Sequence, residues 1–303
     1  MDKRGSNSDI NYITYAEQAT LESKKNKQKY VKFLLETISK QTNKLALFNE
    51  IKEGFLKQQF ELFYQAQIDV ESKKICGAEA LIRWNHPTKG LVSPGIFLPI
   101  IEEFDLIEQL DRYVMIKSMA DCLYFCNNGF DLPISINLST KSLSNPKIFD
   151  LFSLGLNRSQ INPNLITIEI TENSLIEDME TTQKIIAGFV SKGTKIAIDD
   201  FGSGYSSLGY LVRYPSNFLK IDKEFITNIH TSNNLKTIVS NLIKMSHSLG
   251  IKVIAEGVEV IGEAQVLKNM ECDIIQGFLF AKPTNKNVLL DRLQKQGMIE
   301  NKH

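Results

Sequence analysis

The sequence predicts an α/β fold of the closed (β/α)8 barrel type, and two observations support this class. Eight short apolar runs typical of strands alternate with helical patterns over about 250 of the 303 residues. Nearly every run also ends in, or carries near its end, a polar residue suited to binding metal or phosphate. In a closed parallel barrel the carboxyl ends of the strands meet at one mouth, where active sites lie. A doubly wound open sheet is the alternative, but it does not need polar groups at the ends of nearly every strand.

The barrel elements follow one another from a helical period that starts near Leu45 and leads into the first strand, FELFYQAQID. Short runs rich in Ile and Val predict the other strands, and longer runs with apolar residues every three or four positions predict the helices. The further predicted strands cover 76–84, 133–139, 166–171, 194–201, 218–222, 252–258 and 273–280. The predicted helices cover 106–127, 145–155, 177–192, the GYSSLGYLV segment at 204–212, 232–249, 260–270 and 286–296.

Period-two alternation indicates which way the polar residues point. In ITIEIT the three isoleucines share one face of the strand, and Glu169 lies on the other face. Asn137 in ISINLS is likewise opposite the isoleucines. Since the apolar faces should meet the helices, we expect Glu169 and Asn137 to point into the lumen. Asp199 and Asp200 are adjacent, so one points inward and the other reaches the site only because the strand is ending.

The first 44 residues differ in composition from the rest, and we expect them to form a charged helical segment or linker before one domain over 45–298. YAEQATLESKKNKQK at 15–29 predicts a charged helix, and the YVKFL that follows predicts a short strand. The Lys-rich start lacks a signal-peptide core, and no apolar stretch approaches the roughly 20 residues of a membrane span. The sequence therefore predicts no membrane insertion.

Composition excludes several classes of partner and site. Lys plus Arg equals Asp plus Glu at 35 each, so no overall charge attracts a nucleic acid polymer or an anionic membrane. Cys122 and Cys126 are one helical turn apart, but no second pair and no nearby His completes a zinc site. Buried, reduced thiols are typical of a cytoplasmic protein, so we expect this location.

The polar residues at the strand ends form a set with a common chemistry. They are Glu79, Asn137, Glu169, Asp199, Asp200, Lys220, Glu256 and Gln276. Crowded carboxylates take up protons unless cations balance them, and these hard oxygen ligands suit Mg²⁺ or Mn²⁺ better than zinc. Two ions about 4 Å apart can activate a water and stabilise the leaving oxygen of a phosphodiester. The set therefore predicts a metal-dependent phosphoester hydrolase. For a single acid at a strand end, a solvated or salt-bridged side chain is the alternative. For Lys220 the alternative is an ion pair with Asp222.

Eight motifs, which include the strand-end residues, occur in a fixed order. Glu79-Ala80-Leu81 with Arg83-Trp84 comes first, followed by SPGIF at 93–97, INLS at 136–139, EITE at 169–172, DDFGSGYSSL at 199–208, LKID at 219–222, AEGVE at 255–259 and QGFLFAKP at 276–283. On these motifs the chain resembles the EAL domain family, bacterial phosphodiesterases that open cyclic di-GMP to linear pGpG. The resemblance extends from about residue 45 to residue 295. Two small departures are Ala66, where the family usually has Pro, and Ser203, where Thr is common.

The resemblance implies a role for each matching residue and a modified TIM barrel whose first strand is antiparallel to the others. It implies metal ligands at Glu79, Asn137, Glu169 and Asp199, with Asp199 bridging to a second ion held with Asp200 and Glu256. It implies that Lys220 holds the catalytic water and that Glu79 serves catalysis through the metal. Substrate contacts are expected from Arg83, Gln276, Glu259 and Asp222. Glu172 matches a glutamate that anchors the loop after strand four, a loop linked to metal binding and dimerisation; a solvated loop acid is the alternative.

The implied cofactors are two Mg²⁺ or Mn²⁺ ions, and Ca²⁺ is expected to bind but to support little turnover, because its looser coordination misplaces the attacking water. The implied partners are cyclic di-GMP and a second copy of the chain. A non-catalytic cyclic di-GMP receptor or protein-interaction module is the alternative. A Schiff-base aldolase using Lys220 is a third interpretation, but it needs a depressed lysine pKa, which a ring of carboxylates would raise. The first 40 residues also faintly resemble the end of a GGDEF domain.

Overall fold

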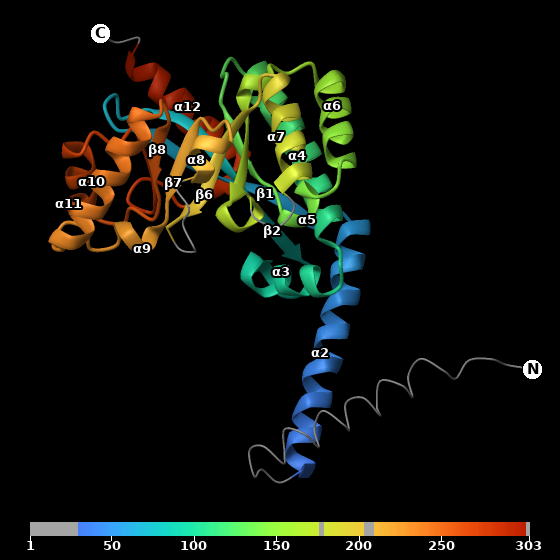
Figure 1. The fold of residues 1–303 in the computed structure, drawn as a ribbon. Coiled ribbons are helices and arrows are strands. Elements are labelled where there is room, and N and C mark those ends of the chain that lie inside the picture. Colours follow the sequence, from blue (N-terminus) through green and yellow to red (C-terminus); the bar gives the residue numbers. More distant parts are fainter. Residues whose placement is uncertain (1–29, 176–178, 203–208, 301–303) are drawn as a thin grey trace, which may run out of the picture. The chain divides into compact units, whose positions relative to one another are not determined.

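The computed structural model describes residues 30–175, 179–202 and 209–300, which divide into two compact units (Figure 1). Among these residues, the first unit takes 30–59 and 84–104, and the second takes 60–83 and everything described from 105 onward. The helix predicted over 15–29 lies outside the described residues, as does most of the GYSSLGYLV segment.

The first unit contains α2 (Tyr30–Leu56), β3 (Gly90–Val92), α3 (Pro94–Glu103) and the end of β2 (Ile75–His86). β3 pairs antiparallel with the end of β2, with Trp84 opposite Val92. Trp84 is fully buried, and its Nε1 donates to Gln59 Oε1 at 3.1 Å. Because its ring is buried and its N–H is hydrogen-bonded, Trp84 stabilises this small unit.

The strand predicted for YVKFL is wrong, because these residues begin α2. The sequence contains neither glycine nor proline from Tyr30 up to Gly54, so this stretch has no helix-breaking residue. The helical period read from Leu45 is thus the second half of one 27-residue helix. The predicted domain boundary at residue 44 falls inside that helix.

The second unit contains the barrel, which confirms the predicted fold class. Its eight strands are β1 (Phe60–Asp69), β2, β4 (Ile134–Asn137), β5 (Ile166–Thr171), β6 (Lys195–Phe201), β7 (Phe218–Ile221), β8 (Lys252–Ala255) and β9 (Ile274–Gln276). Neighbours from β2 through β9 pair in parallel, and pairing between β1 and β2 closes the sheet. β1 pairs antiparallel with β9, as the family resemblance implies.

Helices follow most of the strands, as the alternating pattern predicts. They are α4 (Ile107–Asn127), α5 (Thr140–Leu143), α6 (Lys147–Ser159), α7 (Met179–Ser191), α8 (Gly209–Arg213), α9 (Lys223–Ile226), α10 (Asn233–Ser248), α11 (Ile261–Asn269) and α12 (Lys286–Glu300). The 3-10 turns η1 (Pro163–Leu165) and η2 (Glu172–Leu175) flank β5, and the two-residue β10 (Thr284–Asn285) pairs with β1. No helix in the described ranges has the length and apolar character that a membrane crossing requires.

Both faces of the barrel strands are buried, but with different residues. Ile166, Ile168 and Ile170 of β5 have no exposed surface. Glu169 on the opposite face reaches Lys220 of β7, although β6 lies between these strands in the sheet. A contact that skips a strand has to cross the lumen. The alternation therefore puts Glu169 inside the barrel, as predicted.

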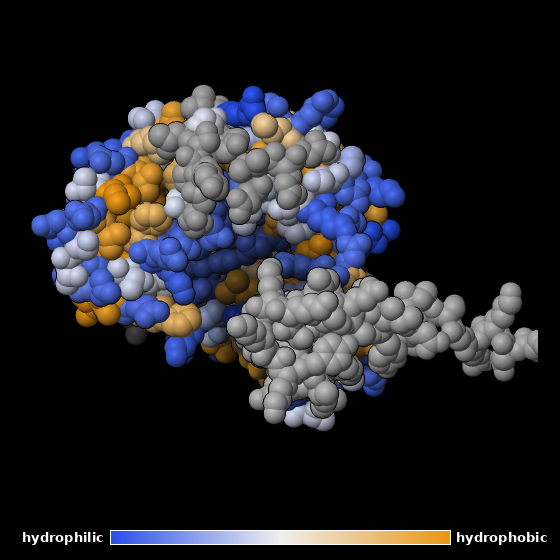
Figure 2. Space-filling view, turned by 60° about the horizontal axis from the view of Figure 1, so that its bottom comes forward, coloured by the Kyte–Doolittle hydropathy of each residue, from blue (hydrophilic) through white to orange (hydrophobic). Residues whose placement is uncertain are grey.

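The carboxyl ends of the parallel strands lie at the lower end of the barrel in Figure 1, where the arrowhead of β6 points. Figure 2 brings this side of the molecule forward and shows hydrophilic surface at its centre, where the surface is hollowed. The contacts described next lie at these strand ends.

Candidate active site

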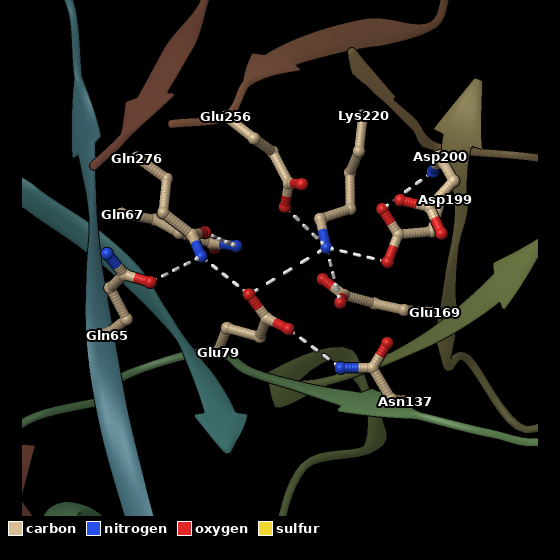
Figure 3. Close-up of polar contacts among 10 residues, drawn as sticks. All are labelled: Gln65, Gln67, Glu79, Asn137, Glu169, Asp199, Asp200, Lys220, Glu256 and Gln276. Carbon is tan, nitrogen blue, oxygen red and sulfur yellow. Dashed lines mark hydrogen bonds and ion pairs between the residues drawn. The ribbon is translucent and has the colours of Figure 1, made fainter. Parts of the chain in front are cut away.

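Seven strands of the barrel supply polar side chains to one end of the lumen (Figure 3). The side chains are Gln65 and Gln67 from β1, Glu79 from β2, Asn137 from β4, Glu169 from β5, Asp199 and Asp200 from β6, Lys220 from β7 and Gln276 from β9. Glu256 joins them from the residue that directly follows β8. All eight strand-end residues singled out in the sequence are thus brought together.

Lys220 occupies the middle of the cluster and is 1% exposed. Its Nζ lies 2.7 Å from Glu169 Oε2, 2.8 Å from Glu256 Oε1, 3.0 Å from Asp199 Oδ2 and 3.8 Å from Glu79 Oε2. Burial alone would lower the pKa of Lys220, but the four carboxylates outweigh it and hold the pKa well above its ordinary value. The amine is therefore an ammonium donor, which argues against the Schiff-base aldolase.

The carboxylates around Lys220 are costly to bury as anions. Burial raises the pKa of Glu169 well above its ordinary value, although Lys220 opposes the shift and Glu79 and Asp199 add to it. Burial also raises the pKa of Glu256, to about 7, again against Lys220. One lysine does not balance all of these acids, so the electrostatics of the cluster favour the entry of further positive charge.

The two adjacent aspartates both reach the cluster because β6 is irregular at its end. The register with β7 shifts between Ile198 and Phe201, and Asp200 has a φ of 53°, in the left-handed region. The Asp200 N–H donates to Asp199 Oδ1 at 2.9 Å, which stabilises this turn. Gly202 follows with a φ of 100°, and a Cβ there would lie 2.8 Å from the ring of Phe225. The DDFG sequence therefore needs its glycine.

Asp199, Asp200 and Glu256 can each offer an oxygen to one metal ion, since these atoms lie within 4.8 Å of one another. Burial raises the pKa of Asp200, and the neighbouring carboxylates of Asp199 and Asp222 raise it further. Asp222 lies at the start of α9, where its side chain accepts from the Glu224 N–H. A divalent cation would relieve the repulsion within this group.

The other side of the cluster is held by amides around Glu79. Asn137 Nδ2 donates to Glu79 Oε1 at 2.7 Å, and Gln276 Nε2 donates to Glu79 Oε2 at 2.5 Å. Gln276 also contacts Gln65 and Gln67 of β1. The sequence interpretation missed these two glutamines, although the alternation in FELFYQAQID places both on the face away from Phe60, Leu62 and Tyr64.

The remaining predicted site residues lie around this core. Arg83 is half-buried, its Nη1 donates to the Ile82 carbonyl, and its guanidinium lies 5.7 Å from the centre of the Phe63 ring. Burial lowers the pKa of Arg83, whereas Glu79 raises it. Glu259 is exposed in the loop between β8 and α11, and its backbone N–H donates to Glu263. Arg83 is therefore close enough to Glu79 for their charges to interact, whereas the contact of Glu259 is to α11.

Glu172 begins η2, directly after β5, and is only 4% exposed. This burial disagrees with the alternative that Glu172 is a solvated loop acid. Its turn is tied down by hydroxyls, because Ser174 Oγ lies 2.6 Å from Thr140 Oγ1 and 2.8 Å from Thr171 Oγ1. These contacts link η2 to the start of α5, the helix that follows Asn137.

The donor set fits a hard divalent cation. Carboxylate and amide oxygens are the ligands that Mg²⁺ and Mn²⁺ prefer. Within the described residues, Glu169 Oε1 is buried and accepts no hydrogen bond from the protein. A buried carboxylate oxygen without a donor is a costly arrangement that a bound cation would satisfy. The residues present therefore suit metal binding at this end of the lumen.

Comparison with known proteins adds independent evidence. The family model of the EAL domain matches residues 49–283. Signaling protein YkoW of Bacillus subtilis is 36% identical over 259 residues, which are 86% of this chain and 32% of YkoW. MucR of Pseudomonas aeruginosa, named a bifunctional diguanylate cyclase/cyclic di-GMP phosphodiesterase, is 33% identical over 81% of this chain and 36% of MucR. The chain thus spans about a third of the length of these two relatives.

Solved structures agree with this match. The PaMucR phosphodiesterase in complex with c-di-GMP is 33% identical, with a TM-score of 0.77 over 80% of this chain and 99% of that chain. The EAL enzyme Bd1971 in its cAMP- and cyclic-di-GMP-bound form is 31% identical, with a TM-score of 0.79 over 87% of this chain and 73% of that chain.

Proposed function

The chain belongs to the EAL domain family, and from this premise we propose that it hydrolyses cyclic di-GMP to linear pGpG with two divalent ions, Mg²⁺ or Mn²⁺. The observation that carries the proposal is the completeness of the site, in which no acid, amide or amine of the predicted set is missing. The names of MucR and of the cyclic di-GMP phosphodiesterase NbdA, together with the c-di-GMP complex of PaMucR, support the choice of substrate.

The proposal divides the acids between two ions. Glu79, Asn137, Glu169 and Asp199 would hold one of them, while Asp199, Asp200 and Glu256 would hold the other. When bound, the ions lower the pKa of a water molecule and stabilise the oxygen that leaves the phosphodiester. Asp199 would contribute to both sets.

The side chains of the protein supply orientation and charge. The Lys220 ammonium donates a hydrogen bond to the attacking water and so aims its oxygen at the phosphorus. Arg83 contacts a phosphate oxygen, and Gln276, Glu259 and Asp222 line the path of the substrate. Glu172 holds the turn after β5, which carries Glu169. One water is added and one phosphodiester bond is opened, so the product is linear.

The direct test uses purified protein with cyclic di-GMP and Mg²⁺ or Mn²⁺, and identifies the product by chromatography. EDTA should abolish turnover, and Mg²⁺ or Mn²⁺ should restore it. Ca²⁺ should compete for the site yet support little turnover. Full activity in metal-free buffer would contradict the two-ion mechanism.

A non-catalytic receptor remains the alternative function. It would bind cyclic di-GMP in a calorimetric titration but release no pGpG under any metal condition. Loss of Glu79, Asn137, Glu169, Asp199 or Lys220 would favour the receptor, and all five are present.

We also propose domain bounds, a cellular location and an oligomeric state for this chain. We place the catalytic domain at 45–298 in a bacterial cytoplasm and propose that it acts as a homodimer. Residues 1–44 are proposed to be a linker or the remnant of a preceding GGDEF domain. Analytical ultracentrifugation with and without cyclic di-GMP tests the dimer.

A further inference from the structure

Gln67 lies on β1 next to the proposed site, but none of the sequence motifs includes it. Its side chain is 5% exposed, and its Nε2 donates to Gln276 Oε1 at 3.1 Å (Figure 3). Gln276 is itself 3% exposed and donates from Nε2 to Glu79 Oε2 at 2.5 Å. Gln67 is thus linked to Glu79 through Gln276, by two successive hydrogen bonds.

The chemistry of the three groups leaves one orientation for the Gln276 amide. An ionised carboxylate only accepts hydrogen bonds, so Gln276 has to turn its NH₂ towards Glu79. Its oxygen then faces Gln67, which must present an N–H. If the amide turned over, one oxygen would meet the carboxylate and two NH₂ groups would face each other.

Gln65 does not replace Gln67 in this arrangement. Its Oε1 accepts from Gln276 Nε2 at 3.3 Å, and its Nε2 donates to the Ala281 carbonyl at 3.2 Å. Both ends of the Gln65 amide are therefore engaged in other bonds. Gln67 is the side chain that donates to the Gln276 oxygen.

Gly77 on β2 leaves the space that the Gln67 amide occupies. A Cβ built on Gly77 would lie 2.7 Å from Gln67 Oε1, closer than atoms can approach without a shift. Gly77, two residues before Glu79, thus leaves room for the Gln67 amide, and its backbone conformation plays no part in this.

We propose that Gln67 is a positioning residue, whose side-chain N–H holds the Gln276 oxygen and so keeps Gln276 in the orientation in which it holds the Glu79 carboxylate for metal binding. Asn137 holds the other oxygen of Glu79, so the two amides together restrict its rotation. The inference rests on the proposed function, since Glu79 is a proposed metal ligand. We expect Gln67 to affect metal affinity more than substrate affinity.

The test replaces Gln67 with Met, which has a similar length but no donor. In a calorimetric titration of the substrate-free protein, Gln67→Met should weaken Mn²⁺ binding about three- to tenfold, as expected for one lost buried hydrogen bond. Turnover of cyclic di-GMP should show the same shift in half-saturating Mn²⁺, and kcat should approach the native value at saturating Mn²⁺. This rescue by metal would not follow from a general loss of packing.

The matched control is Thr167→Val. Thr167 is 3% exposed and lines the same cavity of about 330 Å³ as Gln67, but within the described part of the chain it makes no hydrogen bond to Glu79 or Gln276. Its substitution changes the lumen without touching the amide contacts, and Mn²⁺ affinity should stay within about twofold. Gln67→Glu provides a second variant, since an ionised carboxylate cannot donate to Gln276.

Native Mn²⁺ affinity in both Gln67 variants, or an equal loss in Thr167→Val, would overturn the proposal. If the native chain binds Mn²⁺ but does not hydrolyse cyclic di-GMP, the proposed function fails while the titration still decides the role of Gln67. If the native chain binds no Mn²⁺, crystal structures of the native protein and Gln67→Met decide instead. The Gln276 amide should leave Glu79 in the variant, and an unmoved amide would refute its positioning by Gln67.

Discussion

The two halves of the candidate site are held together by different forces. The charged half, Glu169, Asp199, Lys220 and Glu256, comes from β5 to β7 and the end of β8, and its contacts are ion pairs to one ammonium group. The amide half, Gln65, Gln67, Asn137 and Gln276, comes from β1, β4 and β9, and its contacts are hydrogen bonds that converge on Glu79. Lys220 and Glu79, 3.8 Å apart, connect the two halves.

The difference shows how a barrel can keep several acids close together. Ion pairs depend little on direction, so the charged half can rearrange around an incoming cation. Amide hydrogen bonds depend on direction and do not titrate, so the amide half keeps Glu79 in one place. We infer that the side chains of the charged half rearrange when metal and substrate bind, while the amide half keeps Glu79 in the same position.

The largest effect should come from Lys220→Ala in the charged half. The variant removes the proposed donor to the attacking water, so kcat should fall by about two to four orders of magnitude, while cyclic di-GMP binding remains largely intact. Steady-state kinetics and a separate binding titration measure the two quantities. Lys223→Ala, an exposed lysine three residues away, is the control and should behave as native. An unchanged kcat in Lys220→Ala would remove the lysine from the mechanism.

A smaller but still strong loss should follow Glu172→Ala at the edge of the charged half. If Glu172 shapes the turn after β5, its loss should displace Glu169 slightly and reduce activity about a hundredfold. The Mg²⁺ concentration for half-maximal turnover should rise, whereas the thermal midpoint should hardly change. Glu180→Ala, in the exposed first turn of α7, is the control. Native activity with an unshifted Mg²⁺ dependence would leave Glu172 without a role in the site.

Glu79→Ala should break the link between the two halves. Its carboxylate is the common acceptor of Asn137 and Gln276, so its removal should weaken metal occupancy and, through it, substrate affinity. Metal titration followed by cyclic di-GMP titration at saturating metal separates these effects. Substrate affinity that stays low at saturating metal would show that Glu79 acts on the substrate directly.

In the amide half, Gln276→Leu should reduce activity about tenfold to a hundredfold. Glu79 Oε2 loses a buried donor in this variant, which corresponds to about 1.5–3 kcal/mol for a hydrogen bond to a charged group. The free energy of unfolding in urea should fall by a similar amount. Gln265→Leu, on the exposed side of α11, controls for the added apolar surface. A loss as large as that of Lys220→Ala would contradict the division into two halves.

The smallest effect should come from deleting residues 1–40, because none of the residues that make up the two halves belongs to this part of the sequence. Turnover should stay within a few-fold of that of the full chain, as measured by the same chromatographic assay. The deletion shortens α2, so circular dichroism should verify that the barrel still folds. A hundredfold loss with an intact fold would show that this segment contributes to the active assembly.

Local sequence was enough to predict most of the barrel and the polar residues at its mouth. The alternation of ITIEIT is a property of neighbouring residues, and it correctly separated Glu169 from the isoleucines. The same rule applied to FELFYQAQID would have found Gln65 and Gln67. In contrast, YVKFL is too short for its composition to distinguish a strand from part of a helix, and the long helix around it decides.

The sequence by itself determined which chemical groups are available and on which face of each strand they lie, because both depend on residue identity and period. Only the tertiary structure decided that Lys220 of β7 contacts carboxylates from β2, β5, β6 and the end of β8, and that Gln67 donates a hydrogen bond to Gln276. These contacts join residues far apart in the chain, and they depend on how the barrel closes and on the register between strands. The left-handed turn at Asp200, which brings two adjacent aspartates to one site, depends likewise on the shift of register between β6 and β7.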